Sequence, residues 1–263
     1  CITKGYTSCI KKKCIKNSML KSVLGYIEKK YYDLHKMFCK VDCIISPSEF
    51  NKNQLLKGKL KCNDITVIHN FVNETDKTDY TLGDCAFYFG RLSREKGILN
   101  LVEAINNIPG ARLIIAGDGP EKENIQAYIK EHKLENRITL LGYLNQNDIR
   151  ENIRKCRFVT VPSICFENCP YSILETMEIG KPIIGSKIGG IPELVKDDVN
   201  GYTYAYDCVD DLTDKLKILF ENDEKVNEFS NNSKRLYKEN YSAETYYNKL
   251  MTVYNKYINT DKE

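Results

Sequence analysis

The feature that most constrains this chain is a regular alternation of short apolar runs with helical stretches between residues 86 and 222. The expected strands are Ala86–Phe89, Arg112–Ala116, Ile138–Leu141, Phe158–Val161, Pro182–Gly185 and Gly201–Tyr204. The expected helices are Ile98–Asn106, Lys122–His132, Asn147–Lys155, Tyr171–Ile179 and Val209–Asn222. This alternation implies βαβ units in a parallel, doubly wound α/β sheet with helices on both faces. Ligands of such sheets bind beyond the carboxyl ends of the strands.

The regions outside this alternation predict a second, smaller part of the structure. Two short strands are expected at Cys43–Ile45 and Ile65–Ile68, with a helix between them that ends at Gly58. The polar, acidic stretch 73–84 predicts a linker, and apolar residues at helical spacing predict a helix over 241–258.

Composition excludes several classes of protein. A net charge of +3 is too small to indicate nucleic acid as a partner, and no apolar run approaches the ~20 residues needed to cross a bilayer. The first residue is Cys1, which suggests a fragment or a processed chain. The odd number of cysteines, 11, favours reduced thiols in the cytoplasm. The spacing of Cys1, Cys9 and Cys14 matches no common zinc pattern, so no metal is expected there.

Residues 11–40 form a basic segment with nine lysines against two acids. Its apolar residues recur every three or four positions, which predicts an amphipathic helix; they are Leu20, Val23, Leu24, Ile27, Tyr31, Leu34 and Phe38. One interpretation is an apolar stripe that faces the core below a solvated basic face. The other is contact with an anionic membrane surface, which makes the protein peripheral to the membrane.

Three of the expected strands end in glycine-containing loops. The first is followed by Gly90 and Arg91, then by Lys96 just before a helix. Two cations and free amides at a helix N-terminus favour an anion such as phosphate. The second strand leads into Gly117 and Gly119, where a ligand can approach the backbone closely, and the third leads into Gly142, Tyr143 and Leu144, which could contact a base or belong to the core. No GxGxxG motif opens the first βα unit, which disfavours a dehydrogenase.

Two acidic residues follow the fourth strand. Glu167 lies in the loop before a predicted helix and Glu175 lies in its early turns among apolar residues, so both are expected to face one crevice. A partly buried carboxylate needs hydrogen-bond donors, which a sugar or ribose diol supplies; favourable placement near a helix N-terminus is the alternative. The loop after the fifth strand contains Gly189 and Gly190, which suggests that it presses against the same crevice.

These motifs together resemble a known family. The ordered set GRLSREKG, GDGP, LGYL, VPS, the Glu167/Glu175 pair, GKPIIGSKIGGIPE and NGY is similar to the donor-binding half of GT-B glycosyltransferases, more narrowly family 4, the retaining glycosyltransferase group 1. The resemblance covers the chain from about Ile65 to its end. It implies three parts: a remnant of the acceptor-side N-terminal domain at 1–73, a Rossmann-like nucleotide-sugar domain at 74–240, and a helix at 241–263 that crosses back toward the first part.

The resemblance also implies roles for single residues. Arg91 and Lys96 would bind the diphosphate of a nucleotide-sugar, Glu175 the ribose hydroxyls, and Glu167 the donor sugar. Backbone amides near Asn168, Cys169 and Tyr171 would line the sugar and phosphates, and 142–144 would approach the base. Cys169-Pro170 stands where the family often has Phe-Gly, which removes one backbone donor because proline has no N–H.

The implied activity is transfer of a hexose, with retention, from a nucleoside-diphosphate-sugar to a glycan or lipid acceptor in cell-surface polysaccharide synthesis. Arg91, Lys96 and helix N-termini would stabilise the departing diphosphate, and the lack of a DxD triplet argues against a bound metal. Two alternatives stay open: a nucleotide-sugar-binding fragment without catalysis, and a nucleotide-sugar epimerase.

Overall fold

The computed structural model describes residues 7–75 and 81–258. The chain divides into two compact units, one formed by residues 70–247 and the other by residues 1–69 together with 248–263. Cys1 lies outside the described residues. Within them, the cysteines are free thiols, no cluster of three or more potential metal ligands occurs, and no helix is long and apolar enough to span a bilayer.

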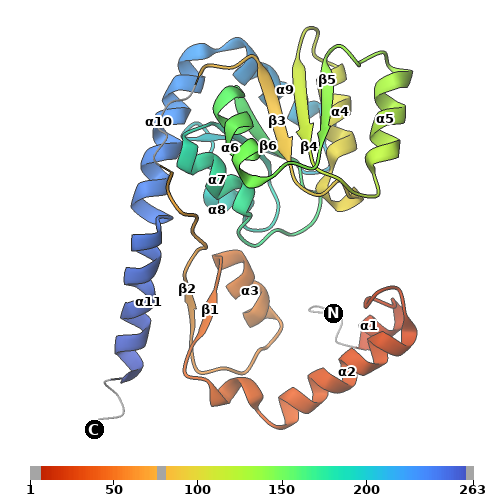
Figure 1. Cartoon of the computed structure of the whole chain (residues 1–263). Helices are drawn as coiled ribbons and strands as arrows, with labels where there is room; N and C mark the ends of the chain where they lie inside the picture. Colours follow the sequence, from red (N-terminus) through yellow and green to blue (C-terminus); the bar gives the residue numbers. More distant parts are fainter. Residues whose placement is uncertain (1–6, 76–80, 259–263) are drawn as a thin grey trace. The chain divides into compact units, whose positions relative to one another are not determined.

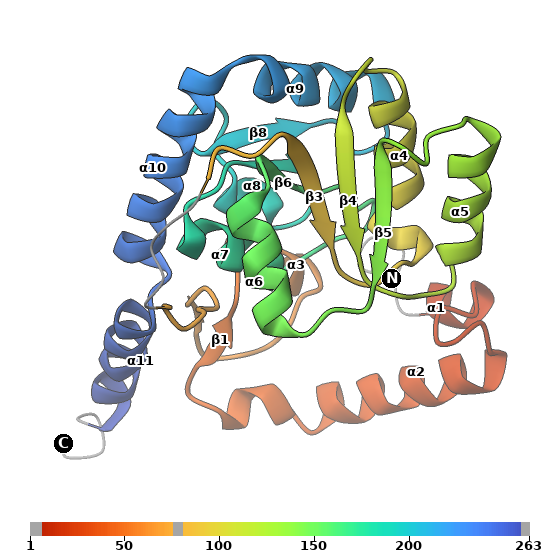
Figure 2. The same ribbon diagram turned by 45° about the horizontal axis from the view of Figure 1, so that its top comes forward.

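The larger unit is built on a six-stranded parallel sheet in the order β5-β4-β3-β6-β7-β8 (Figure 1). The strands are β3 (Cys85–Phe89), β4 (Arg112–Ala116), β5 (Ile138–Gly142), β6 (Phe158–Val161), β7 (Ile183–Ser186) and β8 (Gly201–Tyr204). All six expected strands are confirmed to within a residue or two. Figure 2 shows β3, β4 and β5 side by side and running in the same direction. The order reverses between β3 and β6, which is therefore the switch point of the sheet.

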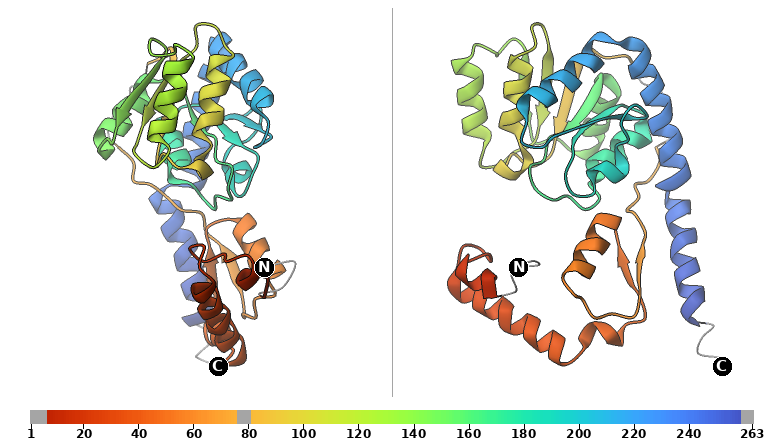
Figure 3. Two further views of the ribbon diagram at one scale, coloured as in Figure 1. Left: turned by 90° about the vertical axis from the view of Figure 1, so that its right-hand side faces the viewer. Right: turned by 180° about the vertical axis from the view of Figure 1, so that it is seen from behind.

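Helices cover both faces of this sheet, as expected for a doubly wound fold. One face carries α4 (Ile98–Asn106), α5 (Lys122–Glu131) and α9 (Val209–Glu221), seen from behind in Figure 3. The other carries α6 (Gln146–Lys155), α7 (Tyr171–Ile179) and the short α8 (Ile191–Leu194). Helix α10 (Asp223–Asn240) reaches both cores, since its Val226 and Phe229 pack into the first and its Tyr237 into the second. Along β3, Ala86 and Tyr88 pack into the first core, whereas Phe87 and Phe89 pack into the second. A strand buried on both faces reads as a continuous apolar run, which is why β3 was visible in the sequence.

Helix α10 was not predicted. Its sequence is strongly polar, and the face that packs into the core uses small serines, Ser230 and Ser233, beside Val226 and Phe229. An apolar-periodicity search passes over such a helix because serine does not count as apolar. The start of the helix could have been detected, because asparagine is a preferred N-cap residue and the Asn222 side chain accepts a hydrogen bond from the Lys225 amide.

The smaller unit contains a two-stranded parallel sheet, β1 (Ile44–Ser46) and β2 (Ile65–Val67), with α3 (Glu49–Lys57) between them. Before it come α1 (Thr7–Lys11), α2 (Met19–Leu34) and the 3-10 turn η1 (Met37–Lys40). The end of α11 (Ala243–Ile258) belongs to this unit, where the Lys256 amine and the Tyr257 hydroxyl both bind Asp64. Both strands lie within one residue of their predicted ranges, and α2, α3 and α11 lie where helices are predicted.

The predicted amphipathic helix is present as α2, but its apolar stripe faces solvent. Leu20, Leu24 and Leu34 are 71%, 58% and 80% exposed, and Ile27 and Tyr31 are also exposed. The interpretation of this stripe as a core-facing surface is therefore wrong for the described structure.

Candidate functional site

The three neighbouring strands β3, β4 and β5 each run into a glycine, and their loops pack backbone to backbone. The Gly117 amide donates to the Gly142 carbonyl at 2.7 Å, and the Leu92 amide donates to the Asp118 carbonyl at 2.9 Å. Gly117 has a φ of +144°, and a Cβ atom there would lie 1.8 Å from the Gly90 oxygen. A Cβ on Gly119 would lie 2.3 Å from the Leu92 oxygen. Both glycines therefore permit a loop–loop contact that no other residue fits.

At the switch point, the loops after β3 and β6 are joined. The Ile164 amide donates to the Glu95 carbonyl at 2.9 Å, and a Cβ on Gly97 would lie 2.0 Å from the Pro162 oxygen. This packing brings Lys96 to Glu167, whose Nζ and Oε1 atoms are 2.5 Å apart. The Ser163 hydroxyl, buried beneath them, also donates to Glu167 Oε1 at 3.0 Å. A cation and a carboxylate from two different loops thus meet at the ligand-binding edge of the sheet.

The loop after β7 holds Glu167 from the other side. The Gly190 amide donates to the Glu167 carbonyl at 2.7 Å, and Gly189, with a φ of +64°, lies against the Glu167 backbone. The Ser186 hydroxyl donates to the Ser163 carbonyl at 2.6 Å. The prediction that the Gly-Gly loop presses against this crevice is confirmed.

Arg91 opens onto a cavity of about 320 Å³ beside the three glycine loops. Its lining includes Gly117, Tyr143 and Leu144, all predicted from the sequence, together with Asp118 and Ile149. Tyr143 is 82% exposed, so its ring is available to a ligand instead of being fixed in the core. The cavity combines an aromatic surface, a cation and accessible backbone.

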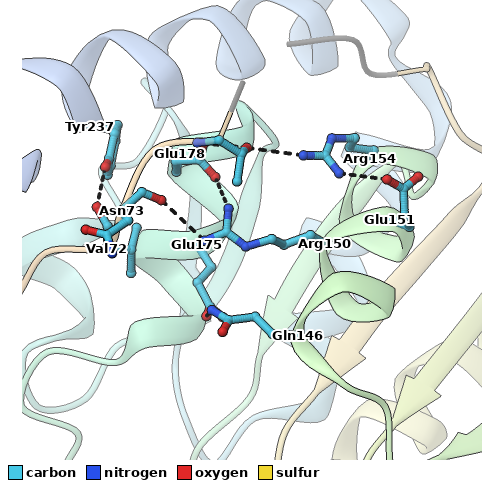
Figure 4. Close-up of polar contacts among 10 residues, drawn as sticks. Val72, Asn73, Gln146, Arg150, Glu151, Arg154, Glu175, Glu178 and Tyr237 are labelled. Carbon is cyan, nitrogen blue, oxygen red and sulfur yellow. Dashed lines mark hydrogen bonds and ion pairs between the residues drawn. The ribbon is translucent and has the colours of Figure 1, made fainter. Parts of the chain in front are cut away.

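Glu175 opens onto a second, more polar cavity of about 430 Å³. Residues 71–75 form one wall, and Gln146, Arg150 and Tyr171 line it with Glu175. The Gln146 amide donates to Glu175 Oε1 at 3.3 Å (Figure 4). Burial raises the pKa of Glu175, and the Arg150 guanidinium and the Gln146 amide partly oppose that shift.

The predicted site residues are therefore distributed over three places. Glu167 does not line the Glu175 cavity, so the expectation that both carboxylates face one crevice is not confirmed. Lys96 meets Glu167. Arg91 shares a cavity with Tyr143 and Leu144. Helix α6 stands between that cavity and the Glu175 cavity, because Ile149 of α6 lines the first and Arg150 of α6 lines the second. Asn168 is exposed. Cys169 is buried, and its carbonyl accepts from the Asn70 side chain at 3.2 Å. Tyr171, exposed, is the first residue of α7, with Pro170 as its N-cap.

Sequence reasoning missed the polar residues that support this site: Ser163, Arg150 and Glu178. Ser163 is the second residue after β6, in the VPS motif. Arg150 is three residues before the core residue Ile153, and Glu178 lies between the core residues Met177 and Ile179. A charge at an apolar position of a helix was the signal that could have identified both.

A parallel sheet with helices on both faces and a switch point beside the Lys96–Glu167 pair defines a Rossmann-like, doubly wound α/β protein. The chain belongs to the glycosyl transferases group 1 family, whose model matches residues 72–236. The resemblance drawn from the motifs is thus confirmed, and the chain is a group 1 glycosyltransferase sequence with a GT-B type fold.

Among similar proteins, an uncharacterized glycosyltransferase of Methanocaldococcus jannaschii is 32% identical over 75% of this chain and 55% of its own length. The O-antigen chain mannosyltransferase C of Escherichia coli is 27% identical over 86% of this chain and 64% of its own length. The crystal structure of Anabaena Alr3699/HepE in complex with UDP superposes with a TM-score of 0.76 at 22% identity, covering 82% of this chain and 64% of that one. The same Anabaena protein has also been solved with UDP-glucose, with a TM-score of 0.74 at 22% identity and the same shares of both chains. The chain thus spans less than two thirds of each of these proteins.

Proposed function

We propose that this chain supplies the nucleotide-sugar-binding half of a retaining glycosyltransferase. In this proposal the whole enzyme moves a hexose from a nucleoside-diphosphate-sugar to a glycan or lipid-linked acceptor during the assembly of a cell-surface polysaccharide. The observation that carries the proposal is the Lys96–Glu167 pair at the switch point of the sheet, in a chain of the glycosyl transferases group 1 family. A cation there suits a diphosphate, and a carboxylate beside it suits sugar hydroxyls.

Each part of the site then has one task. Arg91 and Lys96 bind the diphosphate, Tyr143 and Leu144 contact the base, and Glu175 accepts hydrogen bonds from the ribose. Glu167 orients the sugar, and the backbone near Asn168, Cys169 and Tyr171 lines the sugar and phosphates. When the sugar–oxygen bond breaks, negative charge grows on the diphosphate, and cations already in place stabilise it without reorganisation.

The relatives support the substrate class. One is an O-antigen chain mannosyltransferase, and the Anabaena protein binds UDP and UDP-glucose. A surface glycan is therefore the proposed acceptor, and UDP is the first nucleotide to test. No metal is assigned to the diphosphate in this proposal.

The proposal predicts selective binding of a nucleoside diphosphate to the 263-residue chain. We expect UDP to raise the thermal midpoint more than GDP or ADP does, and to do so equally with EDTA present. A ligand at 100 times its dissociation constant adds about 2.7 kcal/mol to the free energy of unfolding. Differential scanning fluorimetry followed by calorimetry measures this. Absence of binding by all three nucleotides would contradict the proposal.

We also propose peripheral contact with an anionic membrane on the cytoplasmic side, through residues 11–40. The exposed apolar stripe of α2 and the lysines around it, such as Lys21 and Lys30, provide the two attractions that such contact needs. Each lysine near an anionic surface contributes about 1 kcal/mol.

Vesicle co-sedimentation tests this contact. We expect the chain to bind phosphatidylserine-containing vesicles and not neutral phosphatidylcholine vesicles. The double substitution Leu24→Glu/Ile27→Glu should reduce the bound fraction at least tenfold, because it removes apolar contact and adds two repelled charges. Leu56→Glu, at a position on α3 that is 50% exposed, is the matched control. Equal binding to both kinds of vesicle would refute the proposal.

A further inference from the structure

Arg150 of α6 and Glu178 of α7 form an ion pair behind the Glu175 cavity. Their side chains are only 9% and 5% exposed, and Arg150 Nη1 lies 3.1 Å from Glu178 Oε2. A buried pair of this kind does little for stability compared with apolar residues of the same size, so its presence calls for another explanation.

Both residues also hold the segment 72–75 by its backbone (Figure 4). Arg150 Nη2 donates to the Asn73 carbonyl at 3.3 Å, and Glu178 Oε1 accepts from the Thr75 amide and hydroxyl, both at 2.9 Å. From α10, the buried Tyr237 hydroxyl donates to the Val72 carbonyl at 2.6 Å. A segment outside the sheet is thus fixed by side chains of three helices.

That segment is one wall of the cavity onto which Glu175 opens, and Arg150 lines the same cavity. The ion pair therefore sets the position of the wall while its guanidinium faces the cavity. Electrostatics point the same way: burial raises the pKa of Glu175, and Arg150 opposes this more strongly than any other group.

We propose that Arg150 and Glu178 are positioning residues of the donor site: their ion pair fixes residues 73–75 as the wall of the Glu175 cavity, and the Arg150 side chain lines that cavity together with the Glu175 carboxylate. The inference rests on the proposed function, in which that carboxylate receives the ribose hydroxyls. Arg150 and Glu178 do not contact the reacting atoms, so they act through Glu175 and the wall.

The charged and polar groups that face Glu175 come from three elements. Arg150 and Gln146 are on α6, Glu178 and Tyr171 are on α7, which is also the helix of Glu175, and Glu74 lies on the wall. Arg150 and Gln146 lower the pKa of Glu175, whereas Glu178 raises it. Removing Arg150 and removing Glu178 should therefore move this pKa in opposite directions, which a merely structural role would not do.

The test is the titration of Glu175 in the ligand-free 263-residue chain, followed by carbon-13 NMR of the glutamate carboxyls and assigned by comparison with Glu175→Gln. We expect Arg150→Met to raise the titration midpoint, Glu178→Gln to lower it, and Arg150→Lys to leave it near the wild-type value. Arg157→Met is the matched control, because Arg157 is equally buried and bonds Asp223 and the Leu219 carbonyl, away from the lining of the cavity. It should not move the midpoint.

If either single variant fails to fold, Arg150→Met/Glu178→Gln leaves no unpaired buried charge, and its midpoint should still rise because Arg150 has the larger effect. A midpoint that stays at the wild-type value in the folded variants would overturn the inference.

A binding measurement separates this inference from the proposed function. Arg150→Met should weaken UDP about tenfold at pH 7, more at lower pH, and Arg150→Lys should restore most of the affinity. If Glu175→Ala binds UDP as well as the wild type does, the ribose assignment fails. If Glu175→Ala loses affinity while Arg150→Met does not, the positioning role alone is wrong.

Discussion

Lys96→Ala is expected to weaken the binding of UDP about 100-fold. A charge-assisted hydrogen bond contributes about 1.5–3 kcal/mol, and each 1.4 kcal/mol is a factor of ten. The substitution also leaves the Glu167 carboxylate, which Lys96 neutralises at 2.5 Å, to repel the diphosphate. Isothermal calorimetry measures the dissociation constant. Arg94→Ala is the matched control, since Arg94 is an exposed cation of the same loop and should change affinity less than threefold.

The partner substitution separates binding from transfer. Glu167→Gln frees Lys96, so we expect UDP to bind as tightly as it does to the wild type, or more tightly. Sugar transfer by the whole enzyme should nevertheless fall by about 10²–10³, because the group that orients the sugar is lost. Equal loss of UDP affinity in Glu167→Gln and Lys96→Ala would contradict the assignment of Glu167 to the sugar.

Gly117→Ala is expected to lower the free energy of unfolding by about 4 kcal/mol. The added Cβ would lie 1.8 Å from the Gly90 oxygen, and the φ of +144° is strained for any other residue. Relief requires the loops after β3 and β4 to separate, which would also move Arg91, so UDP affinity should fall with stability.

Urea denaturation of the two alanine variants provides the comparison. Gly110 also has a positive φ, +78°, but no heavy atom lies within 4 Å of a Cβ built there. Gly110→Ala should therefore lower the free energy of unfolding by only about 1–2 kcal/mol and leave UDP affinity unchanged. Equal losses at both positions would show that the contact between the loops has no energetic importance.

Much of the fold was predictable because the signals are local. The run at 86–89 is apolar throughout, and the run at 158–161 is apolar except for Thr160, since a central parallel strand is buried on both faces. The polar helix α10 was missed because it buries small serines instead of large apolar side chains.

The candidate site was only partly predictable. Arg91, Lys96, Glu167 and Glu175 could be chosen because each follows a predicted strand, where ligands of such sheets bind. Their grouping could not be read from the sequence: Lys96 and Glu167 are 71 residues apart and meet through backbone contacts between two loops. That Glu175 opens onto a different cavity from Arg91 depends on the placement of α6 between them.

By itself, then, the amino-acid order determined the strands, most helices and the family, because periodicity and short motifs are properties of neighbouring residues. Only the folded chain decided which charges became partners, that the apolar stripe of α2 faces solvent, and that Arg150 and Glu178 hold the wall beside Glu175. The physical reason is that burial and ion pairing depend on side chains brought together from distant segments, and packing alone sets those distances.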